Sequence, residues 1–266
     1  MRNGMIMGAL ALVLAGGAIA APQAPKARGP KSKEEAQALQ AMFSAASPDA
    51  QIAAAEDFVV KYPQSDFKAV AYLGEAQSYQ QKGDYDHTVV AGEQSLESDP
   101  DDTTKVEAEL LLAQVIGPRI GEFDLDREEK LAKVEKFANA ALEALKTMAK
   151  PNNPGLTDAA WEDAKGALNG QAYAALGVDQ IARKDYEKAA AQFKLAVEVT
   201  KGTEPSYQVR LANALDKSGK YDEAIAACDK ALATPNLHPM VKRAADAEKA
   251  NAVKLKAAAA PAAAKP

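Results

Sequence analysis

Residues 173–196 read YAALGVDQIARKDYEKAAAQFKLA, and residues 208–231 read QVRLANALDKSGKYDEAIAACDKA. The two stretches align on Tyr186 and Tyr221, which lie 35 positions apart, and place small and large residues at the same offsets. A weaker copy surrounds Tyr85. A period of about 34 residues with this pattern predicts stacked helix–turn–helix units. The alternative is an amphipathic bundle with chance periodicity, which the matches at nearly every framework position disfavour.

Each copy carries a small residue midway along its first helix and two more on its second helix. Antiparallel helices that cross at short range leave no room for branched side chains there. In the copy around Tyr85, however, Glu75 and Gly92 stand where bulky apolar residues are usual. The small positions are Ala76, Gly177 and Ala212, then Thr88, Ala189 and Ala224, then Ser95, Ala196 and Ala231.

The turn between the two helices also repeats. Gly83 and Gly219 each stand two residues before the turn tyrosine, where a left-handed backbone favours glycine. In the middle copy Lys184 takes this place, so we expect a turn there that is strained or differently shaped.

The pattern resembles the tetratricopeptide repeat family. The resemblance implies an all-α solenoid of antiparallel helix pairs, closed by a C-terminal capping helix of about 239–256. Members of the family hold other proteins on a concave face lined by first-helix residues. Carried onto this chain, the predicted protein-binding residues are Gln77, Gln80, Gln81, Gln171, Arg210, Asn213 and Lys217, with Ala174, Val178 and Val209 between them. We expect Arg210 and Asn213 to be exposed there.

The solenoid is predicted over 33–256, after a Pro- and Lys-rich leader at 21–32 and before an Ala/Pro tail at 257–266. The clearest repeats are 69–102, 170–203 and 205–238, and an enlarged irregular unit fills 103–156. Within this unit a loop follows Gly117-Pro118, and Asp126 with Glu129 resembles a capping arrangement for the next helix. Thr157 is the expected cap of a long helix that follows.

Residues 1–20 resemble a secretory signal peptide. Arg2 precedes an apolar run at 5–17, and Ala18-Ile19-Ala20 supplies small residues for cleavage. An uncleaved membrane anchor is the alternative, but the run is shorter than the roughly 20 residues that span a bilayer. We therefore expect a periplasmic or secreted protein with no stable membrane insertion after cleavage. The turn at Tyr62-Pro63 also resembles periplasmic members of the repeat family.

Composition and residue types argue against several kinds of function. The formal net charge of −5 shows no basic stripe, so nucleic acid is not an expected partner. The two histidines, His87 and His238, lie far apart and indicate neither a metal site nor a catalytic triad. The single cysteine, Cys228, occupies a core position, where it acts as a small hydrophobe rather than a nucleophile. No cofactor is predicted.

Two functions remain open. The first is a non-enzymatic adaptor in the cell envelope that binds a peptide or helix of a partner protein on its concave face. The second is a component of an envelope or outer-membrane assembly machinery, since the chain combines an export signal with the Tyr62-Pro63 turn. An enzyme whose repeats only support another site is disfavoured, because the sequence contains no catalytic constellation.

Overall fold

A computed structural model describes residues 28–259, and these residues form eleven α-helices, one short 3-10 helix and no strand. The predicted signal peptide, residues 21–27 of the leader and residues 260–266 of the tail lie outside the described residues. The elements are α1 (Lys33–Phe43), α2 (Pro48–Lys61), α3 (Lys68–Lys82), α4 (Tyr85–Glu97), α5 (Asp102–Ile116), η1 (Gly117–Arg119), α6 (Arg127–Thr147), α7 (Asp158–Ala182), α8 (Tyr186–Val199), α9 (Pro205–Lys217), α10 (Tyr221–Leu232) and α11 (Pro239–Ala259).

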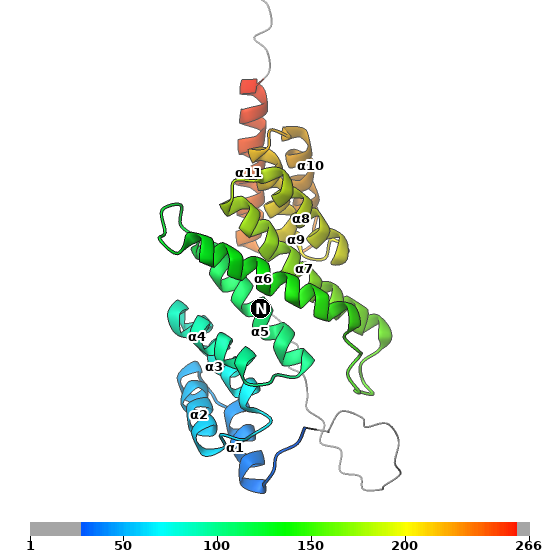
Figure 1. The fold of residues 1–266 in the computed structure, drawn as a ribbon. Helices are drawn as coiled ribbons and strands as arrows, with labels where there is room; N and C mark the ends of the chain where they lie inside the picture. Colours follow the sequence, from blue (N-terminus) through cyan, green and yellow to red (C-terminus); the bar gives the residue numbers. More distant parts are fainter. Residues whose placement is uncertain (1–27, 260–266) are drawn as a thin grey trace, which may run out of the picture.

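The helices pair in chain order and stack into one solenoid, from α1 and α2 at one end to α10 and α11 at the other (Figure 1). Each helix packs against the next one along the chain, and α11 packs on both α9 and α10. This is the predicted all-α arrangement of antiparallel pairs with a capping helix.

The predicted crossing points are buried in all three copies. The positions other than Gly177 are all 0% exposed, which leaves no space for larger side chains. Gly177 lies against the ring of Phe193, and a Cβ atom there would come within 2.6 Å of the Phe193 Cε1 atom. Small residues at these offsets therefore set how closely the two helices of a unit approach.

The turns that join paired helices share one backbone geometry. Gly83 and Gly219 have φ angles of 75° and 78°, and Lys184 has 63° at the same place. In each turn the next residue donates its N–H to a carbonyl five residues earlier, as in Asp185 to Gln180 at 2.9 Å. Lys184 thus keeps the shape of the turn and accepts a left-handed backbone that costs energy for a residue with a Cβ atom.

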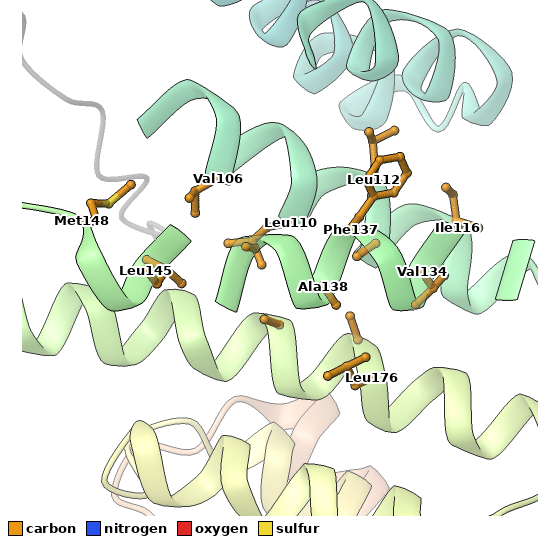
Figure 2. Close-up of a cluster of buried hydrophobic side chains, with 14 residues drawn as sticks. Val106, Leu110, Leu112, Ile116, Val134, Phe137, Ala138, Leu145, Met148 and Leu176 are labelled. Atoms are coloured by element: carbon orange, nitrogen blue, oxygen red, sulfur yellow. The ribbon is translucent and has the colours of Figure 1, made fainter. Parts of the chain in front are cut away.

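The largest hydrophobic cluster lies between α5, α6 and α7. Figure 2 shows α6 between the other two helices, with Leu110 of α5 and Leu145 of α6 directed into the cluster and Leu176 on α7. Aliphatic and aromatic side chains fill this region, although it belongs to the irregular unit. Trp161 and Leu168 pack against its edge.

At the helix ends, one sequence-based expectation is confirmed and two differ from the structure. The Thr157 hydroxyl caps α7 by accepting from the Ala160 N–H at 3.1 Å, as predicted. The capping arrangement expected at Asp126 is wrong, because this carboxylate makes no cap hydrogen bond and pairs with Lys130 at 3.0 Å instead. The last helix, α11, extends to Ala259, so the first three residues of the predicted tail, 257–259, are helical.

Candidate protein-binding surface

The first helices of several successive units lie next to one another. α3 and α5 lie next to each other, as do α5 and α7, and α9 and α11. We call the side formed by α3, α5, α7, α9 and α11 the inner surface. All seven predicted binding residues are on three of these helices, namely α3, α7 and α9.

On α3 the structure leaves most of the predicted polar groups available. Gln80 and Gln81 are exposed, whereas Gln77 is half-buried. The neighbouring Lys82 is engaged in an ion pair with Asp49 of α2 at 2.5 Å. The glutamine amides are therefore the free hydrogen-bonding groups at this end of the helix.

In the middle of the inner surface, Gln171 is half-buried and already has a partner. Its side-chain oxygen accepts a hydrogen bond from Gln114 Nε2 at 2.7 Å, which joins α7 to α5. An amide can donate and accept at once, so this pair still offers N–H groups and a carbonyl lone pair to a bound peptide.

On α9 the predicted residues have three different environments. Arg210 is exposed, and the structure shows no ion pair for it among residues 28–259. Lys217 is also exposed, with its Nζ atom 5.4 Å from the ring centroid of Tyr186, which is within cation–π range. Asn213 is half-buried, because its Nδ2 atom donates to Glu248 of α11 at 3.1 Å. The expectation that Asn213 is exposed is therefore wrong, since the capping helix partly covers it.

Sequence reasoning missed a set of polar contacts between α9 and α11, which we call the polar seam. Asp216 is only 4% exposed, and its Oδ2 atom accepts from Asn251 of the capping helix. Burial, together with the nearby carboxylate of Asp216, raises the pKa of Glu248, although the hydrogen bond from Asn213 opposes this shift.

The two contacts of this seam, 213 with 248 and 216 with 251, each join residues 35 positions apart. This is the period of the repeat. The capping helix α11 therefore occupies the place of the first helix of a further unit, and extending the period beyond residue 238 would have located the seam.

Other kinds of site receive little support in residues 28–259. Cys228 is fully buried, and burial raises the pKa of its thiol to about 11, so the reactive thiolate is scarce near neutral pH. No grouping of three or more His, Cys, Asp and Glu residues suited to a metal ion occurs in the part of the chain that the structure describes. Within the same part, no helix is both long and apolar enough to cross a membrane.

The comparisons agree with the repeat assignment. Residues 205–234, which cover α9 and α10, match the model of a tetratricopeptide repeat. The fold is similar to that of a thermophilic TPR protein from Thermus thermophilus, with a TM-score of 0.51 and 18% sequence identity over 80% of this chain and 98% of the other. The resemblance to the tetratricopeptide repeat family is thereby confirmed for the fold and for this unit.

A second solved structure, an assembly chaperone of RpL4, aligns with a TM-score of 0.39 and 11% identity over 88% of this chain and 100% of the other. A score at this level reflects helical stacking in general and indicates nothing further. A comparison with curated protein sequences finds no match.

Proposed function

We propose that this chain is a non-enzymatic adaptor that binds an extended segment or a helix of another protein on its inner surface. The proposal rests on one observation: the first helices carry polar side chains that take no part in hydrogen bonds among the described residues. Gln80, Gln81 and Arg210 are exposed, and the structure shows no side-chain hydrogen bond for any of them within residues 28–259. Their availability supports a role in binding a ligand.

The chemistry of these groups fits a peptide. Glutamine amides donate and accept, which matches the alternating N–H and C=O groups of an extended main chain. Arg210 adds a donor fork suited to a carboxylate or a main-chain carbonyl. The Gln114–Gln171 pair lies between the two ends and provides further hydrogen-bonding capacity.

The test is a set of alanine variants that leaves the fold intact. Gln80→Ala, Gln81→Ala and Arg210→Ala together should weaken capture of the native partner about tenfold or more, because each removes a group that a bound peptide would pair with. Lys194→Ala with Lys230→Ala is the matched control, since both lysines are exposed on second helices, α8 and α10. The measurement is quantitative mass spectrometry of proteins captured from an extract.

Asn213 is left out of this set because Asn213→Ala would also loosen α11, which its side chain contacts. If every captured protein is retained equally by the triple variant and the control, the inner surface is not the binding site.

We also propose that the chain is exported, with cleavage after Ala20, and acts in the periplasm or outside the cell. The apolar run and small-residue site in residues 1–20 support this proposal. The intact mass of the protein recovered from the envelope should lack these residues, and a mass that still includes Met1 would contradict it. Capture of outer-membrane assembly proteins in the experiment above would favour the alternative role in an assembly machinery.

A further inference from the structure

The capping helix α11 is held on α9 and α10 mainly by polar contacts. Its only buried side chains are those of Ala245 and Ala252, and an alanine removes little apolar surface from water. The helix α9, one period earlier, buries Leu215 as well as smaller side chains. Two ion pairs to α10, one from Lys249 and one from Lys256, lie at the surface, where such pairs contribute little. The polar seam therefore decides how firmly α11 is docked.

The polar seam contains two carboxyl groups that have more acceptor oxygens than donors. Asp216 accepts from Asn251 through its Oδ2 atom, and Glu248 accepts from Asn213 through its Oε2 atom. The other two oxygens, Oδ1 of Asp216 and Oε1 of Glu248, are buried, and within residues 28–259 neither has a hydrogen-bond partner. A buried carboxylate oxygen without a donor costs free energy, and this cost falls when the group carries a proton.

The surroundings of Glu248 favour its neutral form. The titratable and charged groups that face this region are Asp216 and Lys217 on α9, Cys228 and Asp229 on α10, and Lys249 on α11 itself. Burial, and after it the Asp216 carboxylate, raises the pKa of Glu248. The hydrogen bond from Asn213 and the charge of Lys217 oppose this shift but do not cancel it. The Cys228 thiol stays neutral, because burial raises its pKa to about 11. Glu248 therefore keeps its proton to a higher pH than it would in water.

We propose that α11 is a releasable cover on the α9 end of the inner surface, docked while Glu248 carries a proton and released when this carboxyl group ionises beside Asp216. Two partly buried carboxylates repel each other, and release returns both to water. Because α11 is the last helix of the stack and packs on α9 and α10, it can leave without disturbing the earlier units (Figure 1). Docking is strongest below the ordinary glutamate pKa of 4.5 and weakens as the pH rises through the higher pKa of the docked state.

Release of α11 changes the surface that a partner would meet. Asn213 is half-buried beneath α11 and lies on α9 between Arg210 and Lys217, two of the predicted binding residues. When α11 leaves, the Asn213 amide becomes available. This consequence rests on the proposed function, because it matters only if the inner surface binds a partner. The release itself does not, and it can be measured on the protein alone.

The thiol of Cys228 reports the release directly. Cys228 is the single cysteine of the chain, is fully buried and shares a hydrophobic cluster with Ala252 of α11, so departure of α11 exposes it. The full chain is mixed with a dipyridyl disulfide, which reacts with thiols at acidic as well as neutral pH, and the reaction rate is measured. Each rate is divided by the rate of the same chain unfolded in urea at the same pH. This ratio removes the titration of the thiol itself.

The rate ratio of wild type should rise about tenfold or more between a pH of about 5 and a pH of about 8, because Glu248 ionises over this range. Glu248→Gln should hold the ratio constant within about twofold, since the amide stays neutral. Asp216→Asn, which removes the second charge, should also flatten the rise, and it provides the test if Glu248→Gln does not fold. Asp246→Asn is the matched control, because Asp246 is an exposed carboxylate on the same helix, and it should follow wild type.

Three outcomes would contradict the release of α11. The first is a wild-type ratio that stays constant or falls as the pH rises, and the second is an equal rise in wild type and in the seam variants. The third comes from Glu75→Gln, which removes a buried carboxyl group from α3. If this variant alters the ratio, Cys228 is exposed by unfolding of the whole chain rather than by departure of α11. A constant ratio together with weaker partner capture by the inner-surface variants would leave the proposed function standing and rule out only the release.

Discussion

The irregular unit of α5 and α6 and the regular unit of α9 and α10 each form a pair of packed helices, but side chains of different size fill the two units. The first is filled by large side chains such as Leu110, Leu112 and Leu145. The second is built mainly from alanines, including Ala212 and Ala224, with Cys228 among them. The regular unit therefore fixes its geometry through close approach of the two helices, whereas the irregular unit is held together by burial of larger apolar side chains.

The largest expected effect is in the irregular unit. Leu110→Ala should lower the free energy of unfolding by about 2–5 kcal/mol, because it leaves a cavity where the side chain is buried. Leu125→Ala is the matched control and should change it by less than about 0.5 kcal/mol, since Leu125 is exposed to solvent. Urea unfolding measures both. Equal shifts for the two leucines would mean that the α5–α7 cluster is not the core of the molecule.

The regular unit should respond to the opposite change. Ala212→Leu or Ala189→Leu should destabilise the fold by about 1–3 kcal/mol through overpacking at the helix crossing. Both positions are fully buried, whereas Ala258, near the end of α11, is exposed and serves as the control for the same substitution. The readout is the melting temperature. If Ala258→Leu shifts it as much as the other two, small residues do not set the spacing of the helices.

The regular units were predictable from the sequence because their constraints are local and repeat. The offsets of small residues, the turn glycines and the period were enough to identify the helix pairs, and the family resemblance supplied the capping helix. At Lys184 the sequence predicted a turn that is either strained or differently shaped, and the structure shows the first of these, with the same turn shape and a left-handed φ.

The irregular unit and the binding residues were harder to predict because they depend on contacts between distant segments. Nothing local in the sequence shows that Asp124 turns inward while Phe123 turns outward. Likewise, Asn213 has the position of a binding residue, and only the placement of α11 shows that Glu248 already uses it. Gln80, Gln81 and Arg210 are exposed as expected, and their role in binding stays a prediction.

A third prediction compares the first copy of the repeat with the two later ones. Glu75 is buried where they have Leu176 and Leu211, and burial, with the nearby Glu56 carboxylate, raises the pKa of Glu75 to about 7. In the unfolded chain this pKa is near 4.5. Between these two values the folded state keeps a proton that the unfolded state has lost, so stability falls as the pH rises.

Glu75→Gln replaces the titrating carboxyl group with a neutral amide, so it removes the loss of stability that wild type shows as the pH rises. The variant should match wild type at a pH of about 4.5 and exceed it by about 1–3 kcal/mol at a pH of about 8. Glu187→Gln, at an exposed position on α8, should follow wild type throughout. Urea midpoints measured across this range provide the test. A constant difference between Glu75→Gln and wild type would show that the carboxyl group is not neutral in the folded protein.

The smallest expected effect is at the turn between α7 and α8. Lys184→Gly should raise the free energy of unfolding by about 0.5 kcal/mol, because relief of a left-handed φ slightly exceeds the entropy that glycine adds to the unfolded chain. The lost ion pair with Glu122 joins two exposed side chains and contributes little. Lys188→Gly, in the first turn of α8, is the control and should be destabilising, since glycine is a poor helix former. Melting temperatures of the two variants should therefore move in opposite directions. A lower melting temperature for Lys184→Gly would show that the contact of Lys184 with the α5–α6 loop stabilises the protein more than its left-handed backbone costs. The irregular unit would then be coupled to the regular one through this contact.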